Sequence, residues 1–185
     1  MSQTQDADGT TSVLEGSDLD QSTESALRGL RSTSQSWASF ISSEGEVRYP
    51  IHVRWICVRC TNSCRDLPDQ RRKILLTSTD LARITNATRL APKEFSASSR
   101  ALAPYERMMK KRNGRCIFLR GSKCSIYRSR PLICRFYPFC IGPSGAKGFE
   151  VGFDLRCSGI GKGQRRGEKF FRGLVRLAKT ELNCR

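Results

Sequence analysis

The chain has 185 residues, a length typical of one domain or of one domain with a tail. Residues 1–50 carry three basic and eight acidic side chains, whereas residues 51–185 carry 30 basic and nine acidic ones, so an acidic arm precedes a body of net charge +21. No run of eighteen apolar residues occurs, so a transmembrane helix is not expected and we predict no membrane association.

The arm, residues 1–45, is rich in serine, threonine, aspartate and glutamine and poor in apolar side chains. Such a composition does not offset the entropy of ordering a chain, so we expect the arm to be mostly disordered and residues 46–185 to form the domain. Within the arm, residues 22–42 place apolar side chains at loosely helical spacing and are a candidate for a short docked helix.

The first elements of the body are a strand and two helices. Apolar residues alternate over 47–55, which predicts a half-buried strand, and Pro50 makes it an edge strand because proline cannot donate to a ladder. Thr77 or Ser78 is a suitable N-cap for a helix that continues to Leu90. Pro92 then opens a short helical turn through Phe95.

The later elements follow from turn residues and apolar spacing. Asn113-Gly114 predicts a β-hairpin between residues 108–112 and 116–119, since this dipeptide fits a tight turn. Arg130-Pro131 begins another short helix, and alternation over 149–155 predicts a second strand that leads to Cys157. Residues 168–183 form an amphipathic closing helix. These elements predict a small, irregular α+β domain that is rich in cysteine and stapled by a metal or cluster.

All nine cysteines lie in the body. The N-terminus has neither the basic start nor the apolar run of a secretory signal, so we expect a cytoplasmic protein with reduced thiols. Three cysteines form a C-x2-C-x3-C knuckle, which is half of a zinc or cluster site and needs ligands from the later cysteines. The predicted ligands are Cys57, Cys60, Cys64, Cys116, Cys124, Cys134 and Cys157.

Arginines flank these cysteines closely, and neighbouring cations lower the pKa of a thiol, so we expect thiolates rather than thiols. The alternative is that free cysteines are small buried apolar residues. We assign Cys184 and Cys140 to that alternative, because neither belongs to the clusters.

Four segments, WICVRCTNSC, CIFLRGSKC, CSIYRSRPLICRFYPF and CSGIGKG, resemble the successive motifs of the CxxCxxCC cysteine-cluster family, the YkgJ-type zinc- or iron-chelating domain. The resemblance runs from about Trp55 to Gly163. Its most specific part is the string C-x-I-Y-x-x-R-P-x-x-C-R-x-[FY]-P, which begins here at Cys124 and ends at Pro138.

The resemblance implies that the chain binds zinc or an iron–sulfur cluster. The paired cysteines of the family fall on Ser63 and Cys64, so one expected ligand is a serine. If the family uses eight thiolates in two sites, one site here is incomplete or completed by Cys140; if four thiolates bind, Ser63 stands behind the ligands. The resemblance also implies that Arg130 or Arg135 donates hydrogen bonds to cofactor sulfurs, the alternative being a solvated surface.

The primary functional hypothesis is therefore chelation of zinc or of an iron–sulfur cluster, and thiolates suit both metals. The alternative is a nucleic-acid-binding protein, in which a metal staples the fold and the basic body contacts RNA or DNA phosphates. An enzymatic role stays open: the chain has one histidine, no prominent carboxylate pair and no glycine-rich phosphate motif that would support a specific reaction.

Overall fold

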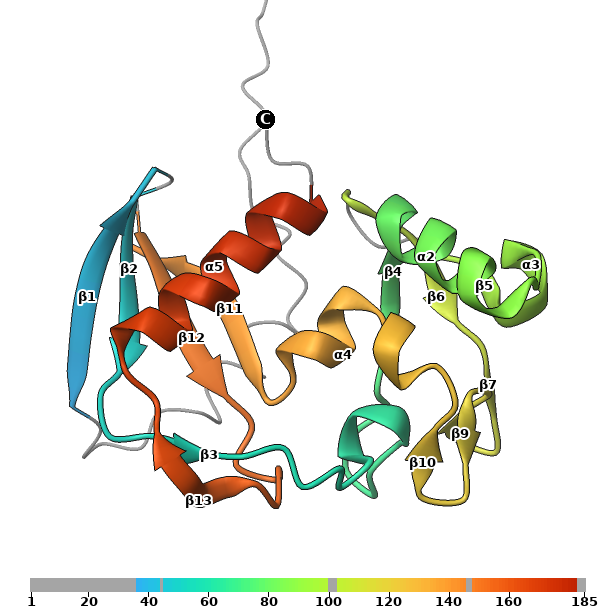
Figure 1. Cartoon of the computed structure of the whole chain (residues 1–185), viewed down its shortest axis with the longest axis horizontal. Helices are drawn as coiled ribbons and strands as arrows, with labels where there is room; N and C mark the ends of the chain where they lie inside the picture. The colour runs from blue at the N-terminus through green and yellow to red at the C-terminus, as the bar shows by residue number, and fades with distance from the viewer. Residues whose placement is uncertain (1–35, 44, 100–102, 146–147, 183–185) are drawn as a thin grey trace, which may run out of the picture.

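The computed structural model describes residues 36–43, 45–99, 103–145 and 148–182. Most of the predicted arm therefore lies outside the described residues. The described chain forms two halves side by side, with short helical segments between them (Figure 1). Helices and strands occur in separate stretches rather than in alternating units, which confirms the predicted α+β class.

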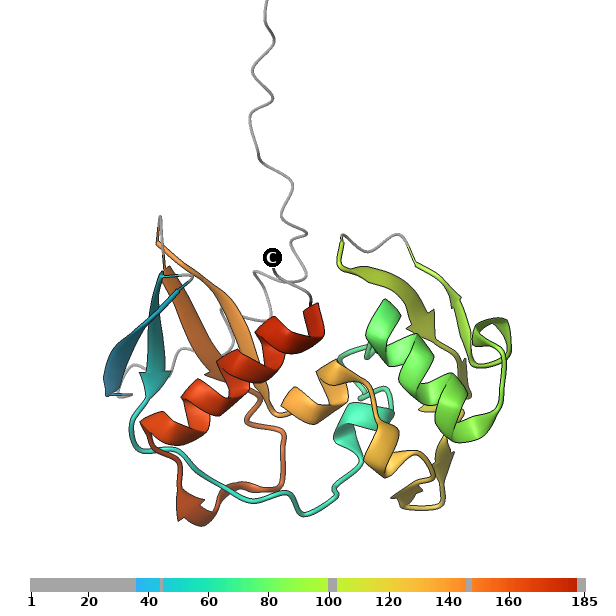
Figure 2. The same cartoon turned by 45° about the horizontal axis from the view of Figure 1, so that its top comes forward.

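The first half is a sheet covered by one helix. Its strands lie in the order β1-β2-β12-β11, with bounds Trp37–Ser42, Gly45–Pro50, Gly148–Phe153 and Phe139–Ser144. Strands β2 and β12 are parallel and the other neighbours antiparallel. Helix α5, Glu168–Leu182, crosses the sheet, as the two views agree (Figures 1 and 2). Its Phe171 is fully buried and stacks on Tyr49 at 4.9 Å between ring centroids, which anchors the first apolar core.

The second half contains a three-stranded sheet, one longer helix and two small ladders. The sheet has the order β4-β6-β5, with bounds Leu75–Thr77, Tyr105–Met109 and Ser96–Ser98. Helices α2, Ser78–Thr88, and α3, Pro92–Phe95, belong to this half. The ladders pair β7, Lys111–Arg112, with β8, Arg115–Cys116, and β9, Leu119–Arg120, with β10, Lys123–Cys124. A second apolar core fills this half.

The remaining elements lie between or below the two halves. Strand β3, Arg54–Trp55, pairs with β13, Ile160–Arg165. Two single turns, η1 over Asn62–Cys64 and η2 over Tyr127–Ser129, and the short helix α4, Leu132–Phe136, follow in chain order. Among the described residues, no helix combines the length and apolar character that a bilayer crossing requires.

Local signals located most elements correctly. Helix α2 begins with a complete capping box, in which Thr77 Oγ1 accepts from the Asp80 amide at 3.1 Å and Asp80 Oδ2 accepts from the Thr77 amide at 3.2 Å. Asn113 and Gly114 have φ values of 49° and 70° and connect β7 to β8 as predicted. The predicted helices at Pro92, Pro131 and Glu168 and the strand after Gly148 are also confirmed.

Two predictions were wrong. The strand expected over 47–55 is divided into β2 and β3, and β2 is an inner strand instead of an edge strand. Proline is tolerated because Pro50 is the last residue of β2. Residues 37–42 form strand β1 rather than the end of a helix, because they pair residue for residue with β2 and bury Phe40 in the core. The division into an arm and a domain at residue 46 stays a prediction, although β1 lies before it.

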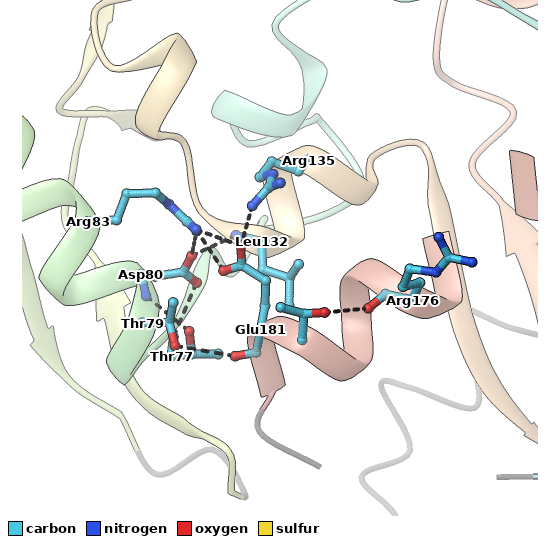
Figure 3. A network of polar contacts seen from close by, with 9 residues as sticks. Thr77, Thr79, Asp80, Arg83, Leu132, Arg135, Arg176 and Glu181 are labelled. Atoms are coloured by element: carbon cyan, nitrogen blue, oxygen red, sulfur yellow. Dashed lines mark hydrogen bonds and ion pairs between the residues drawn. The ribbon is translucent and has the colours of Figure 1, made fainter. Parts of the chain in front are cut away.

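A polar network joins α2, α4 and α5 (Figure 3). The fully buried Asp80 accepts from the Leu132 amide at 2.9 Å and pairs with Arg83. Both Arg83 and Arg135 pair with Glu181, with 2.7 Å between Arg83 Nη1 and the Glu181 oxygens. The network therefore holds the start of α4, the helix that carries Cys134, against both halves.

Candidate metal centre

All seven predicted ligands line one cavity of about 210 Å³. None of the eight cysteines within the described ranges forms a disulfide. Each cysteine reaches the cavity from a short element or turn: Cys57 and Cys60 follow β3, Cys64 ends η1, Cys116 ends β8, Cys124 ends β10, Cys134 lies in α4, and Cys157 lies in the turn after β12. Segments up to a hundred residues apart in sequence thus present sulfur to a common space. We refer to it below as the cysteine cavity.

The knuckle reaches the cavity through two unusual backbone positions. Arg59 and Thr61 have φ values of 52° and 63°, in the left-handed region that is costly for residues with a side chain. The Cys64 amide donates to the Thr61 carbonyl at 2.8 Å and closes the turn. These reversals place Cys57, Cys60 and Cys64 around the same space.

Each end of the knuckle is fixed to a different part of the molecule. At its start, the Ile56 amide donates to the Gly159 carbonyl at 3.2 Å, and Asn62 Nδ2 donates to the Arg156 carbonyl at 2.7 Å. Both bonds tie the knuckle to the turn that carries Cys157. At its end, Arg65 forms a β-bridge with Arg115, and the Asp66 amide donates to the Gly114 carbonyl at 2.7 Å, next to Cys116.

The close approach at Gly159 yields a testable prediction. A Cβ atom at this position would stand 2.0 Å from the Ile56 carbonyl oxygen, which belongs to backbone and cannot turn away. We expect Gly159→Ala to lower the free energy of unfolding by about 2–3 kcal/mol through overpacking, and to weaken metal binding by displacing the Cys157 turn. Denaturant titration and metal content measure both effects.

The control is Gly173→Ala in α5, where a Cβ meets no heavy atom within 4 Å. This change is expected to be neutral or to stabilise the helix by about 0.5–1 kcal/mol. Equal behaviour of the two variants would contradict the assigned role of the Gly159 contact.

Burial controls the charge state of the metal-free thiols. It raises the pKa of Cys116 to about 11, with Cys64 and Cys124 adding to the rise. Burial and then the neighbouring cysteine sulfurs also raise the pKa of Cys134 well above its ordinary value. We expected arginines to lower these pKa values. The arginines near Cys64 do act in that direction, but removal of the thiols from water outweighs them.

The predicted cofactor-binding arginines both line the cavity. The Arg130 guanidinium lies 4.0 Å from the centre of the Tyr127 ring and donates to the Tyr127 carbonyl at 2.8 Å. Arg135 instead pairs with Glu181. Hydrogen bonds from either arginine to a cofactor sulfur stay a prediction. Sequence reasoning missed Lys123, which also lines the cavity and carries no motif that would have identified it.

The donor set suits a thiophilic metal. Within the described ranges, no three cysteine, histidine, aspartate or glutamate side chains already stand in a metal-binding arrangement. Seven soft sulfur donors in one cavity nevertheless match the ligand chemistry of zinc and of iron–sulfur clusters. The Tyr137 hydroxyl, which lines the same cavity, is buried and has no hydrogen-bond partner among the described residues. A buried donor of this kind fits an acceptor supplied by a bound group.

Comparisons with known proteins agree with this donor set. A family model named CxxCxxCC, described as "putative zinc- or iron-chelating domain", matches residues 56–158. An uncharacterized protein of Methanocaldococcus jannaschii is 29% identical over 124 residues, which cover 62% of this chain and 64% of that protein. The match thus spans less than two thirds of the relative. No solved structure matches the chain.

Proposed function

The chain belongs to the CxxCxxCC family, and from this premise we propose that it chelates zinc or iron through the thiolates of its cysteine cavity. The observation that carries the proposal is that Cys57, Cys60, Cys64, Cys116, Cys124, Cys134 and Cys157 all line one space. When bound, the metal or cluster would supply a structural or electron-carrying centre. The chain's own residues hold it, shield it from water through the second apolar core, and offset its charge through nearby arginines.

Purification without oxygen, followed by an absorption spectrum and elemental analysis, tests the proposal. A brown protein that contains iron and sulfide indicates an iron–sulfur cluster, and a colourless protein that contains zinc indicates a zinc site. Substitution of all seven cysteines by serine should abolish either metal. A protein that carries no metal, and takes up neither zinc nor iron with sulfide in vitro, would contradict the proposal.

Metal loading should release protons, because the raised pKa values keep the cavity thiols protonated at neutral pH. Each thiol that becomes a ligand loses about one proton. The apparent affinity should therefore increase with pH up to the pKa of about 11 for Cys116, and decrease in acid. A pH indicator in weak buffer measures the release during zinc addition.

The matched control is Cys116→Ser, which should release about one proton fewer per protein molecule. Zinc uptake without proton release would mean either that the thiols are already ionised or that other groups bind the metal.

The nucleic-acid alternative stays a prediction. Several arginines of the basic body serve the fold: Arg72 pairs with Asp154, Arg156 pairs with Asp69 and Asp154, and Arg166 donates to the Trp55 carbonyl. Part of the positive charge thus has a structural role. A salt-dependent gel shift with RNA and DNA, with and without residues 1–45, tests what remains.

A further inference from the structure

We propose, as an extension that rests on the proposed function, that the cysteine cavity holds two metal centres. A closed centre uses Cys64, Cys116, Cys124 and Cys134, and an open centre uses Cys57, Cys60 and Cys157 and takes a small anionic ligand at its remaining position.

The four cysteines of the closed centre share one apolar environment. Cys116 belongs to the buried core of the second half, and the other three cysteines pack against that core. Their sulfurs are close enough for Cys64, Cys116 and Cys124 each to disfavour ionisation of Cys134. Four thiolates complete a tetrahedral zinc site or the ligation of a cluster, and the core around them excludes water.

The other three cysteines lie outside that core. Cys157 is buried, and its nearest thiol neighbour is Cys60, to which it is hydrogen-bonded. Cys57 is exposed, with its sulfur 3.6 Å from the Tyr127 hydroxyl. This group therefore contains three sulfurs and faces solvent on one side.

The backbone separates the two groups in the same way. The start of the knuckle, which carries Cys57 and Cys60, is bonded to the Cys157 turn through Ile56 and Gly159. The end of the knuckle, which carries Cys64, is bonded to the Cys116 hairpin through the bridge between Arg65 and Arg115. One end thus lies with each centre.

The open centre lacks a fourth sulfur because position 63 is a serine. The Ser63 hydroxyl lies 3.7 Å from the Cys64 sulfur, on the side of the closed centre. A neutral hydroxyl is also a poor ligand for zinc or iron. Three protein ligands with one exchangeable position are the arrangement that metal sites use when they bind an external molecule.

The surroundings favour an anion at that position. The buried Tyr137 hydroxyl lies near Cys60 and Cys157 and has no acceptor within the described residues. Burial and the negative charges of Asp154 and Cys157 raise the pKa of Tyr137, so its hydroxyl remains a neutral donor. The guanidinium groups of Arg59 and Arg130 stack on Tyr127, next to the exposed Cys57. A carboxylate can accept from the tyrosine and is attracted by both arginines.

Cobalt(II) titration of the metal-free protein under anaerobic, reducing conditions tests the two centres, since thiolate–cobalt absorption counts the filled sites. The wild-type protein and Cys140→Ser should each bind two equivalents. Cys124→Ser should retain one equivalent at the open centre, and Cys157→Ser should retain one at the closed centre. Ser63→Cys should tighten the second equivalent at least tenfold.

Acetate then tests the ligand. It should change the cobalt spectrum of the wild-type protein and of Cys124→Ser, but not that of Cys157→Ser or Ser63→Cys. Tyr137→Phe should weaken the acetate response about tenfold, the effect of losing one hydrogen bond to a charged acceptor.

Three results would overturn the proposal: saturation of the wild-type protein by one equivalent, loss of all cobalt in Cys157→Ser, or a spectrum insensitive to acetate. A wild-type protein that binds no cobalt would instead overturn the proposed function itself. Circular dichroism checks folding, and if Cys124→Ser does not fold, the comparison of wild-type protein with Cys157→Ser and Ser63→Cys decides.

Discussion

Replacing Cys134 with alanine is expected to lower the free energy of unfolding of the metal-loaded protein by about 4 kcal/mol or more. Cys134 is carried by α4 between the two halves, and its sulfur lies among Cys64, Cys116 and Cys124. Because the unfolded chain holds no preformed site, metal affinity contributes directly to stability. A thousandfold weaker site removes about 4 kcal/mol by mass action. Denaturant titration with and without metal measures the difference.

Cys140→Ala is the matched control. Cys140 is an exposed, free cysteine that does not line the cavity. Its replacement should leave metal content unchanged and alter the free energy of unfolding by no more than about 0.5 kcal/mol, as for ordinary surface substitutions. If Cys134→Ala keeps the metal and the stability of the wild-type protein, Cys134 is not a ligand.

Asp80→Ala should lower the free energy of unfolding by about 3–5 kcal/mol, the cost of removing one partner of a buried ion pair. The Asp80 side chain is fully buried, completes the capping box of α2, and accepts from the Leu132 amide of α4. Its removal leaves those amides and part of the Arg83 guanidinium without their acceptor (Figure 3). Since α4 carries Cys134, metal affinity should decrease as well.

Glu94→Ala distinguishes loss of the network from loss of a cap. Glu94 accepts from the Ala91 amide at 2.6 Å in the exposed capping box of α3 and has no part in the network. Its removal should cost about 1 kcal/mol and leave metal binding unchanged. Similar losses in the two variants would show that Asp80 acts as an ordinary cap.

Sequence signals predicted the parts of this fold that depend on neighbouring residues. The capping residues of α2, the Asn113-Gly114 turn and the Pro131 start of α4 each act within a few positions, so their meaning survives in any tertiary context. The set of candidate ligands was predictable for a similar reason, because cysteine has a distinctive chemistry and its clustering is visible in the chain.

Long-range pairing was not predictable in this way. Strand β2 gains neighbours from Trp37–Ser42 and from Gly148–Phe153, about a hundred residues away, and this pairing made it an inner strand. The position of Arg135 depends on Glu181 at the opposite end of the body. The raised thiol pKa values depend on burial, which single-sequence charge patterns do not reveal.

The knuckle from Cys57 to Cys64 is a strap between two bodies, because each of its ends is bonded to a different half. Metal bound at one end therefore restricts the strap and, through it, the spacing of the sulfurs at the other end. Filling either centre should favour filling of the other, and by thermodynamic reciprocity the gain must be equal in both directions. The strap turns two local binding events into a single cooperative assembly step for the two halves.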